Sequence, residues 1–411
     1  NITLGVRSLF SLRSGRAAAR AKIIDLSTKF HLVVSPDARV GSLTVGERQR
    51  VEILKALYRD VRILILDEPT AVLTPQETDD LFATLRLAIE SGLSIIFISH
   101  KLHEVMAIAD RVVVLRHGKM IGGARTQDTD KHALAAMMMG TEATAPQVAP
   151  ANPGPPLLEL QDVTTPNIAS APGLKSVSLA LRAGQIIGLA GVSGNGQAAM
   201  ADVVGGLRSP SSGYVALNGT RIQKWSPRRA VQSGVARIPE DRHKTGTIAD
   251  FDLTENAILE RYKTAAFSTS GWLNWRKSRA FAQSIIDKYD VRCPGTDTPI
   301  RLLSGGNMQK LILGRVLEAD PQIILANQPV RGLDIGAVNY VHGQLLAARD
   351  RGAAVLLISE DLDEVMALSD VIHVIVGGSL SPAFGRAEMT PAQLGIWMAG
   401  QGFDDVVAHA S

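Results

Sequence analysis

Two neighbouring carboxylates and a histidine are the residues of this chain best placed to do chemistry. Asp67 and Glu68 follow the apolar run Arg62–Leu66, and His100 follows the next such run, Ser94–Ser99. The carboxyl ends of parallel strands meet at one edge of a sheet, where ligands bind. There Asp67 could hold Mg²⁺, Glu68 could orient and deprotonate an attacking water, and His100 could contact a phosphate group. The alternatives are two acids that cap the next element and a structural histidine.

The segment around these residues occurs twice in the chain, once with its chemical groups and once without them. Three identical pairs lie 260 positions apart and set the register: Leu43 and Leu303, Pro69 and Pro329, and Glu104 and Glu364. In that register the second copy has replaced all three chemical residues: Asp67 by Asn327, Glu68 by Gln328 and His100 by Glu360. A long internal repeat predicts two domains of the same fold.

A glycine-rich stretch of the second copy has the spacing of a phosphate-binding loop. It follows the strand-like run Gln185–Ala190 and precedes a helical pattern. In that context, glycines let backbone amides close on a phosphate at a helix N-terminus. The usual lysine and hydroxyl residue are replaced by Gln197 and Ala198, so a tight strand–helix turn is the alternative. The candidate phosphate-binding residues are Gly191, Gly194, Asn195, Gly196 and Gln197.

A second glycine motif lies at the start of another predicted helix. The stretch Leu303–Gln309 reads Leu-Ser-Gly-Gly-Asn-Met-Gln and precedes an apolar helical run. Its glycines would leave free amides, and its serine a hydroxyl, at a helix start. The matching stretch Leu43–Glu47 has Val45 in place of a glycine, and Glu47 adds a negative charge. The candidate ligand-binding residues of this motif are Ser304, Gly305, Gly306 and Asn307.

The composition is that of an ordinary globular protein and argues against several functional classes. Among 411 residues, 43 are Lys or Arg and 40 are Asp or Glu, and a net charge of +3 gives no argument for nucleic acid. Cys293 is the single cysteine, so no disulfide can form within the chain. The apolar runs are far shorter than the roughly 20 residues of a membrane helix. Association with a membrane would therefore require a partner.

Short β-branched runs alternate with amphipathic stretches, which predicts an α/β fold with parallel sheets covered on both faces. Helices are expected at Pro75–Glu90 and Gly336–Arg349. The stretch Thr141–Pro156 is rich in proline and alanine and is predicted to be a linker. The expected domains are residues 1–140 and 157–411. The remaining strands are predicted at Arg111–Leu115, Gln322–Ala326, Ala354–Ser359 and Val371–Val376.

This ordered series of motifs, present twice, resembles the nucleotide-binding domain of ABC transporters. Leu-Ser-Gly-Gly-Asn resembles the ABC signature, the stretch that ends in Asp-Glu-Pro69 resembles Walker B, and Ser99–His100 resembles the H-loop. Asp334 matches the D-loop aspartate. The stretch Ile238–Arg242 lies where the Q-loop is expected, with Glu240 in place of glutamine. The resemblance implies two P-loop NTPase domains of ABC type in tandem.

The resemblance also implies that two such domains meet head to tail and enclose each ATP between them. One composite site would pair the carboxylates and histidine of the first domain with the signature Ser304–Gly306. The other would pair the loop at Gln197 with the altered signature Leu43–Glu47. That second site lacks the lysine, the Mg²⁺ ligand, the base and the histidine together. One hydrolysing site and one degenerate site are therefore expected.

The first domain departs from the family pattern at its front. Before Leu43 it has no phosphate loop, no adenine-stacking aromatic and no Q-loop, and the stretch 1–5 resembles the segment just after a Q-loop. The first ABC domain is therefore expected to be incomplete and the chain to be N-terminally truncated. Such a chain would hydrolyse little or no ATP. Its first domain should be poorly stable, because much of the sheet core would be absent.

The tandem arrangement resembles the ATPase subunits of bacterial importers for nucleosides and simple sugars. Three blocks favour the nucleoside branch over the sugar branch: Leu43–Arg59, Gly191–Gln197 and Ala326–Asp334. The resemblance implies ATP and Mg²⁺ as ligands, transmembrane permease subunits as partners, and indirectly an extracytoplasmic substrate-binding lipoprotein. It places the protein peripherally on the cytoplasmic face of the inner membrane. The alternative classes are a soluble tandem ABC protein that acts on ribosomes or DNA, and a non-catalytic remnant.

Overall fold

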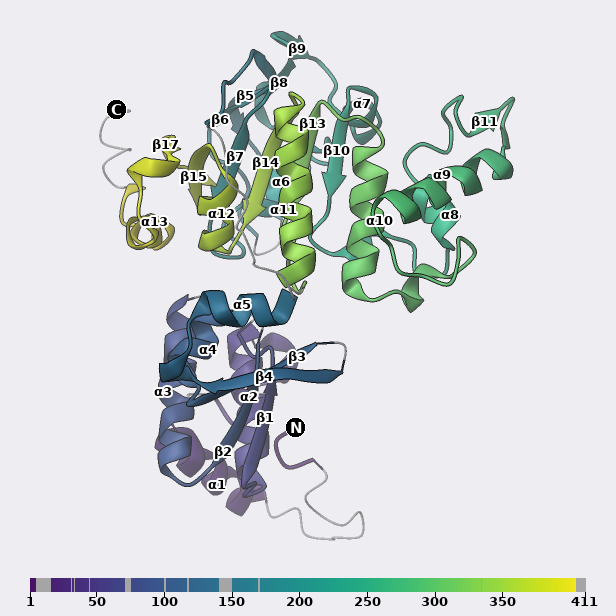
Figure 1. Cartoon of the computed structure of the whole chain (residues 1–411). Coiled ribbons are helices and arrows are strands. Elements are labelled where there is room, and N and C mark those ends of the chain that lie inside the picture. Colours follow the sequence, from purple (N-terminus) through teal and green to yellow (C-terminus); the bar gives the residue numbers. More distant parts are fainter. Residues whose placement is uncertain are drawn as a thin grey trace. The chain divides into compact units, whose positions relative to one another are not determined.

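The computed structural model contains two compact units, and each is considered by itself (Figure 1). Unit 1 comprises Asn1–Thr144 and unit 2 comprises Ala145–Ser411. The division falls within the stretch that the sequence predicts as a linker. The structure describes residues 1–4, 16–30, 32, 34–43, 45–70, 75–99, 101–116, 118–139, 150–168, 171–333 and 335–403.

Unit 1 is built on two small sheets and the helices that pack on them. Strands β1 (Ile63–Asp67) and β2 (Ser94–Ile98) pair in parallel. Strands β3 (Arg111–Arg116) and β4 (Lys119–Arg125) form a separate antiparallel pair. The helices are α1 (Arg16–Lys29), α2 (Val45–Tyr58), α3 (Pro75–Glu90), α4 (Leu102–Ile108) and α5 (Lys131–Met139).

A seven-stranded sheet forms the centre of unit 2 (Figure 1). Its order is β10-β13-β14-β7-β15-β16, with β17 paired to β15, and the first five of these strands run parallel. The strands of this sheet are β7 (Ile186–Ala190), β10 (Val235–Ile238), β13 (Ile323–Asn327), β14 (Ala354–Ser359), β15 (Val371–Val376), β16 (Ser379–Leu380) and β17 (Phe384–Gly385).

An antiparallel sheet and eight helices complete the described part of unit 2. The antiparallel sheet has the order β6-β5-β8-β9, and β11 and β12 form a short hairpin. These strands are β5 (Pro156–Thr164), β6 (Val177–Arg182), β8 (Ser212–Leu217), β9 (Thr220–Ile222), β11 (Ser268–Thr269) and β12 (Trp272–Leu273). The helices are α6 (Gln197–Val204), α7 (Pro227–Gln232), α8 (Leu253–Ala257), α9 (Trp275–Lys288), α10 (Gly305–Leu317), α11 (Ile335–Asp350), α12 (Leu362–Leu368) and α13 (Pro391–Met398).

The strands and the two helices predicted by residue range are all present to within one residue at each end. The pattern was informative because the central strands of unit 2 are apolar on both faces, as strands of a covered parallel sheet are. Along β13, Ile324 faces one core, with α10 and α11, while Ile323 and Leu325 face the other, with α6 and the antiparallel sheet. Both faces of the parallel sheet of unit 2 are therefore covered, as predicted.

The same expectation is wrong for unit 1, whose parallel sheet is covered on one face. Leu64 and Leu66 pack into a core with α2 and α3. Ile63 and Ile65, on the other face, are 60% and 62% exposed, although their counterparts Ile323 and Leu325 are 1% and 2% exposed. The cause is that α6 and the antiparallel sheet cover this face in unit 2, and no described helix or sheet of unit 1 packs on the matching face.

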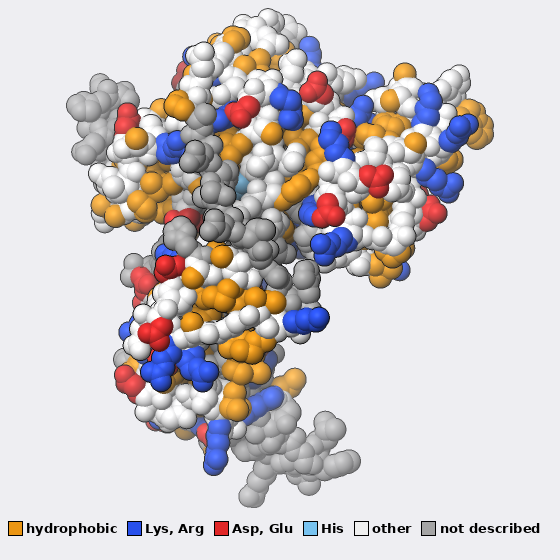
Figure 2. Space-filling view, in the orientation of Figure 1, with side chains coloured by type: hydrophobic (Ala, Val, Ile, Leu, Met, Phe, Trp, Pro, Cys, Tyr) orange, Lys and Arg blue, Asp and Glu red, His pale blue; other side chains and the backbone are white. Residues whose placement is uncertain are grey.

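A second apolar surface of unit 1 covers β3, β4 and α5 (Figure 2). Large side chains of the two strands are exposed here: Val113, Leu115, Met120 and Ile121. The counterpart of Val113 in unit 2 is His373, on β15. His373 is buried, and β15 lies between β7 and the short strands at the sheet edge. Among the described residues, no helix is long and apolar enough to cross a bilayer.

Candidate functional site

The two carboxylates of unit 1 lie at the carboxyl end of a parallel strand, as predicted. Asp67 is the last residue of β1 and is exposed, and the side chain of Glu68 is half-buried. Glu68 has a φ of 46°, in the left-handed region that costs a residue with a Cβ about 1 kcal/mol. Its backbone N–H donates to the carbonyl of Ile98, at the end of β2, over 2.9 Å. The strand pair thus holds the backbone of Glu68 in a strained conformation.

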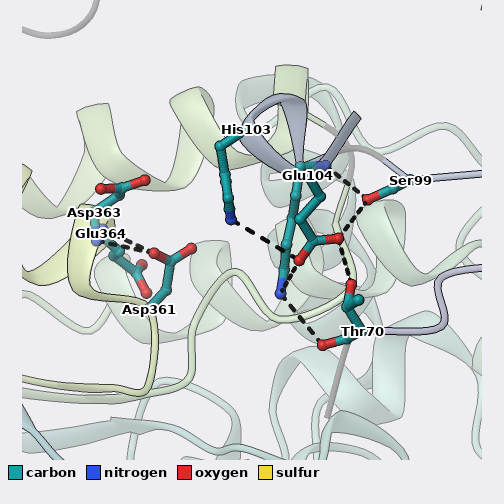
Figure 3. A network of polar contacts seen from close by, with 8 residues as sticks. Thr70, Ser99, His103, Glu104, Asp361, Asp363 and Glu364 are labelled. Carbon is teal, nitrogen blue, oxygen red and sulfur yellow. Dashed lines mark hydrogen bonds and ion pairs between the residues drawn. The ribbon is translucent and has the colours of Figure 1, made fainter. Parts of the chain in front are cut away.

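A buried glutamate joins the ends of these two strands (Figure 3). Glu104, on α4, is 1% exposed. Its Oε2 accepts hydrogen bonds from Thr70 Oγ1 and, over 3.3 Å, from Ser99 Oγ. Its Oε1 lies 3.3 Å from Nζ of Lys101. One carboxylate is therefore bound both to the turn after β1 and to the end of β2.

Unit 2 repeats the backbone of this edge without its carboxylates. Asn327 ends β13, and Gln328 follows it with a φ of 50°. The N–H of Gln328 donates to the carbonyl of Ile358 over 2.8 Å, as that of Glu68 does to Ile98. A neutral amide cannot take a proton from an attacking water. The sheet edge of unit 2 therefore has the backbone geometry of the edge of unit 1 but lacks its carboxylates.

Glu364 of unit 2 matches Glu104 but is held by a different set of partners. It is 4% exposed, and Ser359 Oγ donates to its Oε2 over 2.6 Å. Its Oε1 lies 3.0 Å from Nε2 of His342, on α11. Val330 stands where unit 1 has Thr70 and brings no hydroxyl. The bond from the buried glutamate to the turn after the strand is thus specific to unit 1.

The glycine-rich stretch forms the turn between β7 and α6, and its own side chains fill it. Gln197 is buried; its Oε1 accepts the N–H of Asn195 over 3.0 Å, and its Nε2 donates to the carbonyl of Val192 over 2.9 Å. One amide that would face a phosphate is therefore already bonded. Glycine is required where φ is strongly positive, at 85° in Gly194 and 117° in Gly196.

Asn195 ties this loop to the turn after β15. Its Oδ1 accepts the N–H of Gly377 over 3.0 Å, and its carbonyl accepts that of Gly378 over 2.9 Å. Gly191 lies so close to Gln197 that an added Cβ would sit 2.7 Å from the amide nitrogen. The loop has the close backbone approach of a phosphate cradle, but a phosphate would have to displace the Gln197 side chain.

The motif Ser304–Asn307 lies at the start of α10, as predicted. Ser304 is the N-cap, and its hydroxyl accepts hydrogen bonds from the backbone N–H of Asn307 over 3.5 Å and from the side-chain amide over 3.0 Å. The Asn307 Oδ1 accepts the N–H of Arg292 over 2.8 Å. Gly305 and Gly306 open the helix, where backbone N–H groups have no acceptor within the helix. This end of α10 is therefore a surface suited to an anion.

The stretch predicted at the Q-loop position follows β10. Glu240 makes an ion pair of 2.6 Å with Arg331, and Arg242 donates to the carbonyl of Arg331 over 3.0 Å. The Arg242 guanidinium also lies beside Gly305, since an added Cβ there would sit 3.3 Å from it. Burial lowers the pKa of Arg242, although Asp241 opposes this. The segment thus joins the start of α10 to the segment after β13.

Two predicted site residues, His100 and Asp334, lie outside the described residues. In unit 1 the structure places Asp67 and Glu68 next to each other at the end of β1. In unit 2 the glycine loop and the motif at the start of α10 lie on different elements. The sequence reasoning missed the roles of Thr70 and Glu104. Their signal was present: Glu104 is an acid within a largely apolar helix and has an identical counterpart 260 positions later.

Comparisons with known proteins agree with this architecture. The sequence model of the ABC transporter family matches residues 5–71 and 174–331. The guanosine import ATP-binding protein NupO of Bacillus subtilis is 42% identical over 97% of this chain and 79% of its own length. The nucleoside import ATP-binding protein NupA of Lactococcus lactis is 39% identical over the same shares. The chain therefore belongs to the ABC transporter family, as an ATP-binding subunit of the kind that couples ATP hydrolysis to import.

Other relatives carry sugar-related names. The glucose import ATP-binding protein TsgD13 of Haloferax volcanii is 41% identical over 98% of this chain and 73% of its own length. Among solved structures, an ATP-binding cassette of an ABC transporter covers 60% of this chain and 98% of that cassette, with a TM-score of 0.50 and 18% identity. That likeness bears on the fold alone.

Proposed function

We propose that this protein powers the uptake of nucleosides by an ABC importer. The observation that carries the proposal is the pair of nucleoside-import relatives at 42% and 39% identity, each matched over 97% of this chain. Its partners are then transmembrane permease subunits and, through them, an extracytoplasmic substrate-binding lipoprotein. The protein lies on the cytoplasmic face of the membrane, bound to the permease. Simple sugars are the second candidate substrate, favoured by the glucose-import relative at 41% identity.

Reconstitution separates the two substrates. The protein is assembled with its permease subunits and binding protein in phospholipid vesicles, with ATP on the side of the ATP-binding subunit. ATP-dependent accumulation of radiolabelled guanosine, with no accumulation of glucose or ribose, is the expected result. Accumulation of a sugar without guanosine would overturn the nucleoside assignment. The matched control is the same assembly with ADP in place of ATP.

Unit 1 supplies the reactive residues of the hydrolytic site in this proposal. Asp67 offers a carboxylate at the exposed end of β1, and carboxylate oxygens are the ligands that suit Mg²⁺. When bound, the metal would neutralise charge on the phosphates of ATP. Glu68 takes the proton of the attacking water, and its fixed backbone limits where its carboxylate can lie. The proposal assigns to His100 a contact with the terminal phosphate, and to Asp334 the role of the D-loop aspartate.

In unit 2, the proposal assigns phosphate binding to the signature. The Ser304 hydroxyl and the amides of Gly305 and Gly306 bind the terminal phosphate, and Asn307 holds the serine. The degenerate phosphate loop of unit 2 contains Gly191, Gly194, Asn195, Gly196 and Gln197. Because the Gln197 side chain already occupies the cradle, that site binds ATP weakly and does not hydrolyse it.

A further inference from the structure

The structure holds the proposed general base of unit 1 through a closed ring of bonded groups. Starting from Glu68, the backbone N–H binds the carbonyl of Ile98, and the next residue of the chain is Ser99. Ser99 donates to Glu104, and Thr70 donates to the same carboxylate (Figure 3). Thr70 is separated from Glu68 by a single proline. The ring therefore fixes the chain on both sides of Glu68.

We propose that Glu104 and Thr70 are positioning residues for hydrolysis, which fix the turn after Glu68 to the end of β2 and so limit where the Glu68 carboxylate can lie. The inference rests on the proposed hydrolytic role of Glu68. The same positive φ occurs at Gln328 without such a bond, so the bond acts on the turn beside Glu68 and not on this backbone angle. Glu104 and Thr70 are 1% and 0% exposed, so their bond is shielded from water and competes with no solvent. A base that shifts by 1 Å can lose about a hundredfold in rate.

A purely structural role is disfavoured by the comparison within the chain. Glu364 is as buried as Glu104 and keeps the bond to its serine, Ser359. It has lost the bond to the turn after the strand, because that position is Val330. Its other oxygen is satisfied by His342 from α11. The ring is therefore open in the unit where glutamine has replaced the base, and closed in the unit that keeps the base.

Reciprocal substitutions test the proposal in the assembled importer, whose ATP-binding subunit must include a phosphate loop for unit 1. Thr70→Val copies the residue of unit 2 into unit 1 and removes one hydroxyl at nearly constant volume. We expect the kcat for ATP hydrolysis to fall about tenfold to a hundredfold, with the KM for ATP unchanged within about twofold. Glu104→Gln should act in the same direction. Thr70→Ser keeps the hydroxyl and should restore kcat to within about threefold of the parent.

The matched controls are the counterparts in unit 2. Val330→Thr and Glu364→Gln change the same positions of the repeat, so a merely structural role would affect both units alike. We expect both variants to leave kcat within about twofold, at a temperature where melting curves show all variants folded. Equal losses of kcat in Glu104→Gln and Glu364→Gln, or equal rates for Thr70→Val and Thr70→Ser, would overturn the proposal.

Amide exchange gives a readout that needs no turnover. In Thr70→Val, the backbone N–H of Glu68 should exchange roughly threefold to tenfold faster, as expected for the loss of one hydrogen bond. The N–H of Gln328 in the same molecule should be unchanged and serves as the internal control. If Glu68→Gln leaves ATP hydrolysis intact, the proposed catalytic role of Glu68 itself is wrong. If Glu68→Gln abolishes hydrolysis while Thr70→Val changes neither kcat nor exchange, only the positioning role is wrong.

Discussion

The strand edges of units 1 and 2 have the same backbone and opposite chemistry. Glu68 and Gln328 follow matching strands, have φ values of 46° and 50°, and donate their N–H to matching carbonyls. Strand pairing sets that conformation, and the side chain at the position does not. The loss of a carboxylate can therefore abolish a reaction without undoing the fold. The comparison also shows that buried partners such as Thr70 differ along with the reactive residue.

The largest expected effect is on the rate of ATP hydrolysis, when Glu68 of unit 1 and Gln328 of unit 2 are exchanged for one another. Glu68→Gln should lower the rate of ATP hydrolysis by the assembled importer about a hundredfold to a thousandfold, because the neutral amide cannot take the proton of the water. Gln328→Glu should raise the rate by less than about twofold. At that second site, Gln197 and Ala198 still stand in place of a lysine and a metal-binding hydroxyl. Steady-state phosphate release measures both variants.

An increase of the hydrolysis rate well above about twofold in Gln328→Glu would contradict the description of the second site as degenerate. The useful control is Asn327→Asp combined with Gln328→Glu, which restores the full carboxylate pair. If this double variant also fails to gain activity, the missing groups of the Gln197 loop are sufficient to silence the site.

The next effect concerns the uncovered sheet face of unit 1. Leu325→Ala should destabilise unit 2 by about 2–5 kcal/mol, since the leucine is 2% exposed within a dense core. Ile65→Ala, at the matching position, should cost below about 1 kcal/mol, because that side chain is 62% exposed. All four tryptophans belong to unit 2, so tryptophan fluorescence in urea reports Leu325→Ala. Hydrogen exchange of peptides from β1 reports Ile65→Ala.

A comparable cost for Ile65→Ala would mean that another group covers this face in solution. Ser94→Ala, on the same two-stranded sheet but with a small exposed side chain, controls for general effects of substitution on unit 1. Its cost should lie within about 0.5 kcal/mol of zero.

The sequence predicted the strands and the edge carboxylates because those features depend on local patterns. Apolar runs of β-branched residues make strands such as β14, and residues at strand ends lie at the sheet edge. From the motifs absent before Leu43 it predicted that much of the sheet core of unit 1 is missing. It could not predict which face is bare, because a run such as Ile63–Leu66 reads the same whether one face or both are covered. It also missed the bond between Thr70 and Glu104, since hydrogen bonds between distant residues depend on tertiary packing.

A smaller effect is expected from opening the phosphate loop of unit 2. Gln197→Lys removes the side chain that bonds the Asn195 amide and supplies a cation for a phosphate. A charge-assisted contact contributes about 1.5–3 kcal/mol, so ATP should bind roughly ten to a hundred times more tightly. Titration with a fluorescent ATP analogue measures the gain. Gln197→Ala is the control, since it opens the loop without adding charge, and equal affinity in both variants would contradict a role for the cation.

The smallest expected effect contrasts His373 of unit 2 with Val113, its counterpart in unit 1. Burial lowers the pKa of His373 below its ordinary value of 6.5, although bonds to the carbonyls of Ser381 and Pro382 oppose the shift. The unfolded chain then binds a proton more readily than the folded one, so stability is complete above pH 6.5 and falls as the pH drops below it. The slope should not exceed about 1.4 kcal/mol per pH unit. Urea midpoints of unit 2, followed by tryptophan fluorescence from pH 8 to pH 5, should show this slope in the parent and a flatter profile in His373→Val. The variant should also be less stable at pH 8, where it lacks the 2.9 Å bond between the histidine Nδ1 and the Ser381 carbonyl. An unchanged slope in the variant would assign the acid sensitivity of unit 2 to another group.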